Sequence, residues 1–378
     1  MEKKNRIFCL AALLLGILLL CSCGKSSSSS GSAEITAGIE HDTKYNMANV
    51  ILSQEEFEAA GFCLGDSCDI EFENGYTIND VPYYNGYYVR NGDPVIVAYP
   101  GFSYIGITYN NTGIWDSASL SEGDTVTIRL NEAGKYSAVQ EGLGQVYSFL
   151  REDYTTDEEF CNFRALTGGH LKENFLYRGA SPVDNSRGRA AYTDGLLSRA
   201  GIAFVLDLAD SEEDMAGYLA SDDFASFYAE DLYKQGQIAL LGMGSGYQSE
   251  EYCQELVSGL KQMLNSQGPV YIHCMEGKDR TGFVCMLLEA LAGADYEEMR
   301  ADYMITYQNY YSVSEEETPE KYDAIVELYF DAFVSFLHGT DDMDVLYSAD
   351  YTQDAADYLI SGGMTEEEVS SLIAFITE

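Results

Sequence analysis

The feature that most constrains this chain is a short loop expected between a buried strand and a buried helix. Residues 269–272 are mainly β-branched and aromatic, and residues 283–291 are almost wholly apolar and rich in good helix formers. The loop between them holds Cys274 and Arg280, with five residues separating the two. Its successive N–H groups can converge on an anion, and the helix N-terminus adds positive potential at the same point. The sequence therefore predicts a phosphate-binding loop.

Cys274 and Arg280 are expected to play different parts in this loop. The positive potential favours the thiolate form of Cys274, which is the form that attacks phosphorus. The planar guanidinium of Arg280 can hold two phosphoryl oxygens at once and stabilise the charge of the transition state. We expect the phosphate to be bound by the run that follows the cysteine, which comprises Met275, Glu276, Gly277, Lys278, Asp279, Arg280 and Thr281.

The string from His273 to Gly282 resembles the His-Cys-x5-Arg-Thr-Gly signature of the cysteine-based protein tyrosine phosphatase superfamily. Its Gly-Lys-Asp-Arg-Thr wording is similar to that of the bacterial dual-specificity branch, whose members also accept phosphoinositides. The resemblance extends from about residue 155 to the end of the chain. One departure is Ala209, at a position where relatives usually carry arginine, so a secondary charge contact is expected to be missing.

The leaving oxygen of a phosphate ester needs a proton, and a nearby carboxylic acid is the usual donor. Two candidates remain open. The resemblance implies a catalytic role for Asp279, which lies beside Arg280 inside the loop. Asp207, at the end of a predicted strand, resembles the more distant general acid of other family members, although a structural carboxylate is an equal reading. We favour Asp279.

Several neighbouring residues are expected to support the site. His273 orients the loop from behind, and Thr281 donates its hydroxyl to the cysteine sulfur. Lys278 adds a point charge suited to a multiply phosphorylated substrate, and Arg178 does the same from another loop. Arg164 is expected to pin a turn.

Residues 151–378 show the alternation of an α/β domain with a mostly parallel central sheet flanked by helices. Residues 202–208 are predicted to form a buried strand, and the apolar positions of residues 252–264 share one helical face. Asp295 with Glu298, and Thr365 with Glu368, have the spacing of capping boxes at two helix starts. The acidic stretch from about 211 to 250 is interpreted as a mobile lid with glycine hinges.

Residues 41–150 are predicted to form a small all-β module, a sandwich or a barrel. The stretch is rich in Tyr, Val, Ile and Gly, and Asn-Gly pairs at 74–75, 85–86 and 91–92 are typical of hairpin turns. Its tyrosines could stack on a ligand, although core packing explains most of them better. This subset comprises Tyr83, Tyr84, Tyr87, Tyr88 and Tyr104.

The N-terminus predicts export and a lipid anchor. Residues 1–22 carry three basic side chains followed by a short apolar run, the layout of a secretory signal peptide. Cys23 resembles the lipobox cysteine that is acylated in bacterial lipoproteins, and residues 23–40 include a serine-rich tether. We therefore expect an extracytoplasmic lipoprotein of the bacterial cell membrane, contacting the membrane through its lipid alone.

Charge and cysteine usage narrow the partners. The net charge is −41, which repels nucleic acid and anionic lipid, so phosphate affinity must be local. Cys161, Cys253 and Cys285 read as inert buried thiols, and a bridge between Cys63 and Cys68 is conceivable. No metal or organic cofactor is implied.

The predicted function is hydrolysis of phosphomonoesters through a cysteinyl-phosphate intermediate. A phosphorylated peptide, above all one carrying phosphotyrosine, is the first choice of substrate. A phosphoinositide or inositol polyphosphate is the second, favoured by Lys278. A catalytically silent phosphate-binding surface protein, with the β module acting as the binding part, remains an alternative of another class.

Overall fold

The computed structural model describes residues 33–144, 147–244 and 246–377. Within them lie two β-sheets, and each sheet packs in a hydrophobic core of its own. These residues belong to one unit by their contacts, Ala33–Glu378. The predicted signal peptide, Cys23 and the serine run lie outside the described residues. Strand β1 already begins at Glu34, so assigning residues 34–40 to the tether was wrong. In the described ranges, no helix is long and apolar enough to cross a membrane.

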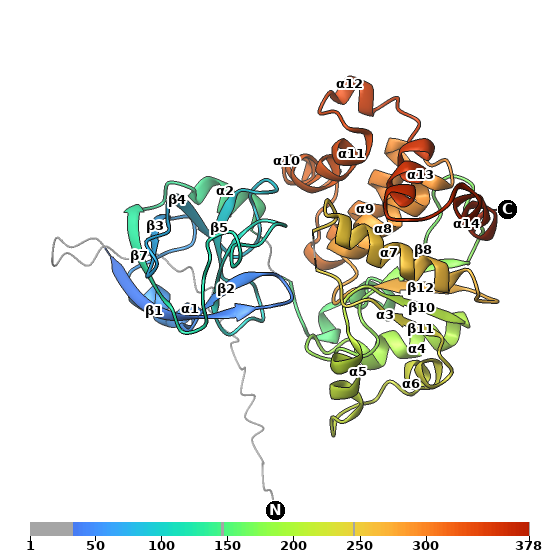
Figure 1. Ribbon diagram of the computed structural model, residues 1–378, viewed down its shortest axis with the longest axis horizontal. Coiled ribbons are helices and arrows are strands. Elements are labelled where there is room, and N and C mark those ends of the chain that lie inside the picture. Colours follow the sequence, from blue (N-terminus) through green and yellow to red (C-terminus); the bar gives the residue numbers. More distant parts are fainter. Residues whose placement is uncertain (1–32, 145–146, 245, 378) are drawn as a thin grey trace, which may run out of the picture. The chain divides into compact units, whose positions relative to one another are not determined.

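Seven strands of the described residues close into a barrel in the order β1-β2-β6-β5-β4-β3-β7 (Figure 1). This confirms that the N-terminal module is a β-barrel, one of the two predicted forms. Alternating apolar residues point into the barrel and give it a core of its own. The strands are β1 (Glu34–Asp42), β2 (Met47–Val50), β3 (Ser67–Phe72), β4 (Thr77–Tyr84), β5 (Pro94–Val97), β6 (Ile105–Tyr109) and β7 (Thr125–Glu132).

The turn predictions for the barrel were correct once and wrong twice. The pair 74–75 joins the antiparallel strands β3 and β4, as expected of a hairpin. The pairs 85–86 and 91–92 both lie between β4 and β5, which run parallel, so this connection crosses over instead of turning back. The module also contains two short helices, α1 (Gln54–Ala59) and α2 (Ser137–Leu143), so it is not purely β.

The outer face of the barrel carries a second apolar cluster. On β5, Ile96 packs inside the barrel, whereas Val95 and Val97 belong to the outer cluster, which also receives Leu328 from the C-terminal half. Burial on both faces explains the continuous apolar run of this strand. Tyr83, Tyr84 and Tyr88 are at most 5% exposed, so core packing was the right reading for them.

The second sheet has five strands in the order β11-β10-β12-β9-β8. Strands β10, β11, β12 and β9 pair in parallel, and the short edge strand β8 pairs antiparallel to β9. Both are features of a mixed α/β fold. The strands are β8 (Arg164–Ala165), β9 (Leu176–Gly179), β10 (Phe204–Asp207), β11 (Ile238–Leu240) and β12 (Val270–His273).

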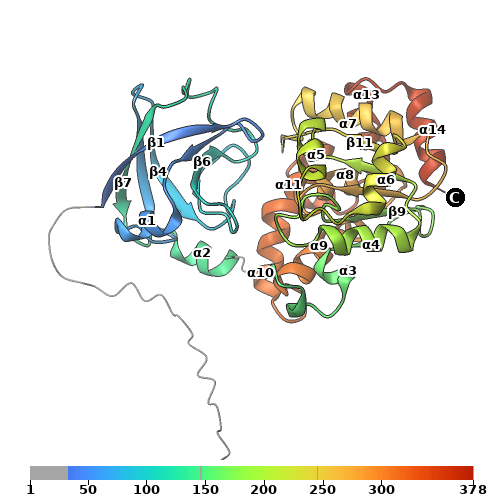
Figure 2. The ribbon, with the colours of Figure 1, turned by 90° about the horizontal axis from the view of Figure 1, so that it is seen from below.

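Helices cover both faces of this sheet (Figure 2). Phe204, Leu206 and Ile272 face α7 (Glu250–Met263) and α8 (Asp279–Leu291) in the largest core cluster. Val205 and Tyr271 point the other way, where residues of α4 (Ala190–Ala200) and α6 (Phe227–Lys234) cover them. Helix α8 is buried almost along its whole length, as its apolar sequence predicts.

Most of the stretch interpreted as a lid is part of the fold. It forms α5 (Glu212–Leu219), α6 and β11, and β11 is paired into the sheet. The lid interpretation was therefore wrong for these elements. The remaining helices are η1 (Arg151–Asp153), α3 (Asp157–Phe160), α9 (Tyr296–Tyr311), α10 (Pro319–Ile325), the π-helix η2 (Val326–Phe330), α11 (Asp331–His338), α12 (Met343–Leu346), α13 (Thr352–Ser361) and α14 (Glu366–Ile376).

The predictions about helix caps and buried thiols agree with the structure, except for the bridge between Cys63 and Cys68. Both capping boxes are present, at the starts of α9 and α14. Cys161, Cys253 and Cys285 are free and buried, and burial raises the pKa of each thiol. Cys68 is also a free thiol buried in the barrel core, so the bridge to Cys63 considered from the sequence is absent.

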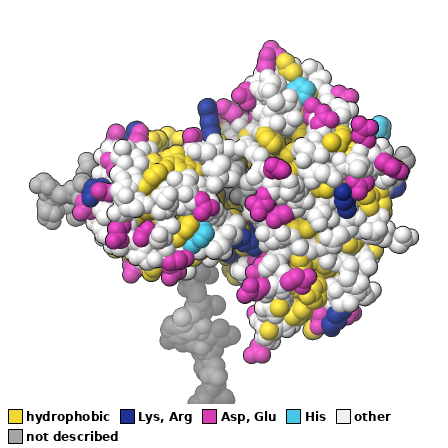
Figure 3. All heavy atoms as spheres, in the orientation of Figure 1, with side chains coloured by type: hydrophobic (Ala, Val, Ile, Leu, Met, Phe, Trp, Pro, Cys, Tyr) yellow, Lys and Arg dark blue, Asp and Glu magenta, His cyan; other side chains and the backbone are white. Residues whose placement is uncertain are grey.

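Acidic side chains are spread over the face of the molecule shown in Figure 3, with few Lys and Arg between them. This distribution agrees with a net charge of −41. Anion binding must therefore depend on a small region where cations are concentrated.

Candidate active site

The loop between β12 and α8 lies at the end of a buried strand, where the chain turns sharply into a buried helix. Gly277 makes this turn with φ of +67°, a conformation that side chains disfavour. A Cβ at this position would lie 2.2 Å from the carbonyl oxygen of Gly179 on β9. The loop can therefore sit tightly on the sheet only if residue 277 is glycine.

The carbonyls of the loop are all directed outward and bound there. The Met275 oxygen accepts from the Ser181 N–H at 3.0 Å, and the Glu276 oxygen accepts from the Tyr310 hydroxyl at 2.9 Å. In a trans peptide the next N–H points the opposite way. The N–H groups of residues 276–278 therefore face the inside of the loop, and no acceptor within the described parts of the chain binds them. Together they form a concave donor surface suited to an anion.

A buried network of charged and polar side chains hydrogen-bonds the Gly277 carbonyl oxygen. Arg178 donates to this oxygen at 2.9 Å and to Asp302 at 2.6 Å, while Asn162 donates to the same oxygen at 3.2 Å. Arg164 donates to Asp302 at 2.7 Å, so its role is to pin the chain, as expected. Arg178 lies on strand β9 and is only 1% exposed. Its interpretation as a substrate contact from another loop was wrong, because its guanidinium is used to hold the loop.

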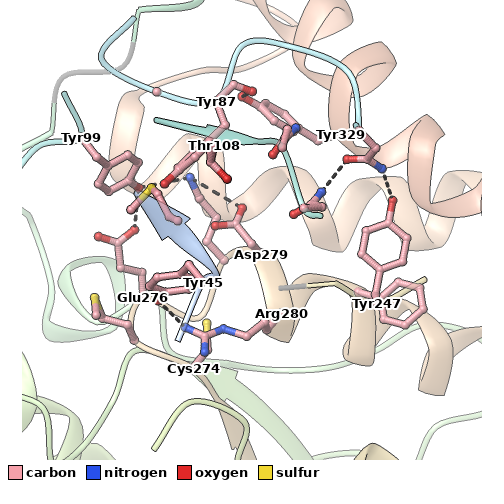
Figure 4. Close-up of a pocket in the computed structure, with 18 of the residues that line it drawn as sticks. Tyr45, Tyr87, Tyr99, Thr108, Tyr247, Cys274, Glu276, Asp279, Arg280 and Tyr329 are labelled. Carbon is pink, nitrogen blue, oxygen red and sulfur yellow. Dashed lines mark hydrogen bonds and ion pairs between the residues drawn. The ribbon is translucent and has the colours of Figure 1, made fainter. Parts of the chain in front are cut away.

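Cys274, Asp279 and Arg280 line one cavity with a volume of about 150 Å³ (Figure 4). Cys274 is 4% exposed and Arg280 is 6% exposed, so both are largely shielded from solvent. Arg280 donates from Nη1 to the Met243 carbonyl at 2.7 Å and from Nη2 to the Tyr45 hydroxyl at 3.2 Å. The guanidinium is thereby held in place on the cavity wall.

Glu276 and Lys278 lie on the same loop but form side-chain contacts at its rim. Glu276 accepts from the hydroxyls of Tyr99, at 3.2 Å, and Tyr147, and pairs with Arg187 at 3.4 Å. Lys278 donates to the Tyr99 hydroxyl at 3.5 Å and lies 3.7 Å from Asp279. Burial disfavours the charged form of Lys278, but the negative potential of Asp279 and the neighbouring tyrosines outweighs it, so its pKa is raised.

The two candidate acids have different surroundings. The Asp279 side chain is 59% exposed and lines the cavity with Cys274. Asp207 is fully buried and does not line the cavity, and its Oδ1 accepts from the N–H groups of Ala209 and Asp210. Burial raises the pKa of Asp207 to about 6. The structure thus places Asp279 at the cavity and leaves Asp207 buried at the end of β10, outside the cavity lining.

His273 and Thr281 are both buried next to the cysteine. His273 Nδ1 lies 3.1 Å from the Cys274 carbonyl oxygen, and its Nε2 lies 3.7 Å from Asp207. Burial lowers the pKa of His273 to about 4, so the neutral ring donates to the Cys274 carbonyl. The Thr281 hydroxyl has no hydrogen-bond partner within the described chain, so the expected bond to the cysteine sulfur is not formed in this structure.

Several residues of the site were missed by the sequence analysis. Asp302 and Asn162 build the support of the loop, and the sequence analysis gave neither residue a role. Arg187 is buried and lines the cavity, but in the sequence its only distinction is that basic residues are few in this acidic chain. The barrel contributes the cavity residues Tyr45, Met47, Gly86, Tyr87, Asn91, Tyr99, Phe102, Thr108, Tyr109, Asn110, Asn111 and Gly113.

A family model described as the tyrosine phosphatase family matches residues 158–378, more than half of the chain. The chain belongs to the tyrosine phosphatase family. This membership supports phosphatase activity in general and places the loop with Cys274 and Arg280 inside the family region. The barrel strands, which end at Glu132, precede it.

Solved structures give weaker similarities. An uncharacterized conserved protein from Thermotoga maritima has 14% identity and a TM-score of 0.23, and the match covers 26% of this chain and 37% of that chain. TpbA of P. aeruginosa has 18% identity and a TM-score of 0.21, and the match covers 53% of this chain and 86% of the TpbA chain. The chain thus spans about a third of the Thermotoga protein. No curated protein matches the sequence. The assignment to the tyrosine phosphatase family rests on the family model.

Proposed function

We propose that this member of the tyrosine phosphatase family hydrolyses phosphomonoesters through a cysteinyl-phosphate intermediate. The observation that carries the proposal is one small cavity that contains a thiol, a fixed guanidinium and a carboxyl group, at a loop whose N–H groups face inward. Nucleophile, charge stabilisation and proton donor are the three functions that such a reaction requires.

In the proposed first step, the Cys274 thiolate attacks phosphorus while the bond to the alcohol oxygen breaks. The inward N–H groups and Arg280 bind the non-bridging oxygens, and Asp279 transfers its proton to the departing alcohol. Water then attacks the phosphocysteine and gives its proton to Asp279, which releases inorganic phosphate and restores the thiolate. Asp279 is preferred over Asp207 as the acid because it lines the cavity and Asp207 does not.

Phosphotyrosine in a peptide is the proposed substrate, and the resemblance to the dual-specificity branch extends the proposal to other phosphorylated side chains. A phosphoinositide is the second candidate, and the observation in its favour is Lys278, a buried cation of this loop that lines the cavity.

The test is metal-free hydrolysis by the full chain of a phosphotyrosine peptide, a phosphoserine peptide, a phosphatidylinositol phosphate and inositol hexakisphosphate. Cys274→Ser is the control, and we expect its turnover to fall by at least about a thousandfold. Equal turnover by the wild type and Cys274→Ser would contradict the cysteinyl-phosphate mechanism. Phosphate binding without any turnover would instead support the silent binding protein.

We also propose that the enzyme is an extracytoplasmic lipoprotein held to the bacterial membrane through Cys23. The proposal is supported by the basic, then apolar, then cysteine order of the N-terminal residues. Expression of the full gene in a bacterial host should place the protein in the membrane fraction, and Cys23→Ala should release it from that fraction. Membrane association that survives Cys23→Ala would contradict the lipid anchor.

A further inference from the structure

The barrel reaches the candidate active site through three separate segments. Tyr45 lies in the turn between β1 and β2, Tyr87 follows β4, and Tyr99 follows β5. All three line the cavity that contains Cys274 (Figure 4). They lie well before residue 158, where the match to the family begins. Family membership therefore does not account for this wall of the cavity.

Tyr45 contacts the residue on which phosphate binding is proposed to depend. Its hydroxyl accepts from Nη2 of Arg280 at 3.2 Å, and the guanidinium carbon lies 5.7 Å from the centre of its ring. The Met243 carbonyl holds the other terminal nitrogen at 2.7 Å. An arginine whose two terminal nitrogens are both held loses less conformational entropy when it binds a phosphoryl group. Its N–H donors also stay aligned with the charge of the transition state.

Two groups of aromatic rings border the same cavity. In the barrel module, the ring centres of Tyr87 and Tyr99 lie 5.9 Å apart, and those of Tyr99 and Phe102 lie 5.7 Å apart. In the phosphatase region, the ring centres of Tyr247 and Phe283 lie 4.6 Å apart. All of these residues line the cavity of about 150 Å³. A cavity of about 150 Å³ has room for a benzene ring. The space beside the phosphate loop therefore suits a flat, apolar group.

The charges around the cavity suit a single phosphate group. In the protonation state that the proposed mechanism requires, the charged groups lining it are Arg187, Lys278 and Arg280 against Glu276 and the Cys274 thiolate, which leaves an excess of one positive charge. Glu276 lies 3.4 Å from Arg187, and the Asp279 carboxyl group lies 3.7 Å from Lys278, so two of the cations already have a carboxyl group beside them. A second phosphate would meet these carboxyl groups in a chain whose net charge is −41.

We propose that the barrel residues lining the cavity determine which substrates the active site accepts, and we call these residues the specificity wall. Tyr45 acts as a positioning residue for Arg280, and Tyr99, with Tyr87 and Phe102, receives the leaving group. The barrel then selects the aromatic phosphate ester already proposed as substrate over a polyphosphorylated sugar alcohol. This inference rests on the proposed phosphatase function, and it adds a role for a module that the family match does not include.

The experiment measures kcat and KM of the full chain with phenyl phosphate, glycerol phosphate and inositol hexakisphosphate. Tyr45→Phe keeps the ring and removes the acceptor, so we expect kcat/KM to fall about tenfold for phenyl and glycerol phosphate alike. Tyr99→Leu should raise KM about tenfold for phenyl phosphate alone, whereas Tyr99→Phe should keep most of the aromatic preference. Tyr136→Phe is the matched control, because this barrel hydroxyl bonds Asp80 and the residue does not line the cavity.

The outcomes separate this inference from the proposed function. Wild-type turnover of phenyl phosphate with all barrel variants equal to Tyr136→Phe would overturn the specificity wall and leave the phosphatase proposal standing. Faster turnover of inositol hexakisphosphate than of phenyl phosphate would overturn the substrate class. The same substitutions are made in Cys274→Ser, and binding of a phosphotyrosine peptide is measured by calorimetry. Weaker binding by Tyr45→Phe and Tyr99→Leu would support the wall even without turnover, and unchanged binding would overturn it. Thermal unfolding of each variant checks that it is folded.

Discussion

The phosphate loop and the barrel wall line the same cavity, but they are built in different ways. The loop is held by its own strand and helix, by a glycine that no other residue can replace and by buried ion pairs beneath it. The barrel wall is held by single hydroxyls, such as that of Tyr45 on Arg280, and by ring contacts. The comparison suggests that the chemistry is set by a loop held through many buried contacts and the choice of substrate by fewer, weaker contacts.

The largest expected effect is on the loop support. Asp302→Ala leaves Arg164 and Arg178 buried without their carboxylate, and we expect a loss of about 3–5 kcal/mol in the free energy of unfolding. Urea denaturation measures it. The control is Glu230→Ala, which removes the largely exposed pair with Lys234 and should cost less than about 1 kcal/mol. Equal losses in the two variants would break the contrast between a rigid loop and a loosely held surface.

The assignment of the acid can be sharpened by a matched pair of substitutions. Asp279→Asn should lower kcat about 100-fold or more for glycerol phosphate, because the alkoxide leaving group needs a proton. The loss should be smaller for nitrophenyl phosphate, whose leaving group departs readily without one. Asp207→Asn keeps an oxygen for the two N–H groups it binds and should change kcat less than about tenfold. A larger effect at Asp207 would reverse the assignment.

The close packing of the loop on strand β9 is tested by a substitution at Gly277. Gly277→Ala puts a Cβ 2.2 Å from the Gly179 oxygen at a positive φ, so we expect a loss of about 1–3 kcal/mol in stability and a raised KM. Gly75→Ala is the control, since its φ is also positive but no heavy atom lies within 4 Å of the added Cβ. Similar losses of stability would show that backbone conformation alone, and not the close approach to β9, explains the glycine.

A last prediction concerns a polar contact between the barrel and the phosphatase region, whose effect depends on pH. Lys44, in the β1–β2 turn, lies 3.6 Å from Asp210, yet burial and the nearby Asp207 raise the pKa of Asp210 from 3.8 to about 7. The folded state therefore holds a proton between these values that the unfolded state has lost. Stability from this carboxyl is full below about pH 4 and is lost as the pH rises to about 7.

Asp210→Asn removes this titration. The melting temperature of the variant relative to the wild type should therefore rise between about pH 4 and pH 7, as measured by calorimetry across that range. Other groups act on Asp210, namely His273, Asp184 and the Tyr218 hydroxyl, and they are unchanged in the variant. Lys44→Met should destabilise the protein mainly above pH 7, where Asp210 is charged. A pH-independent difference for Asp210→Asn would contradict the raised pKa.

Much of the loop was predictable from the sequence because its determinants are close together in the chain. Cys274 and Arg280 are separated by five residues, and the apolar run of α8 is legible as a buried helix. Caps were predictable for the same reason, since Asp295 and Glu298 meet within one helical turn. Arg178 was misread because its partner, Asp302, lies 124 positions further along the chain.

The sequence by itself determined the strand, loop and helix around Cys274 and the β character of the N-terminal module, because strands, tight turns and buried helices follow from local patterns of residues. The motif in this loop also indicated the tyrosine phosphatase family. Only the tertiary structure decided which carboxylate reaches the cavity, which buried arginine supports the loop and that barrel residues line the cavity. Tyr45 and Arg280 are 235 positions apart. Contacts at such separations arise from the packing of whole elements, and no spacing in the sequence encodes them.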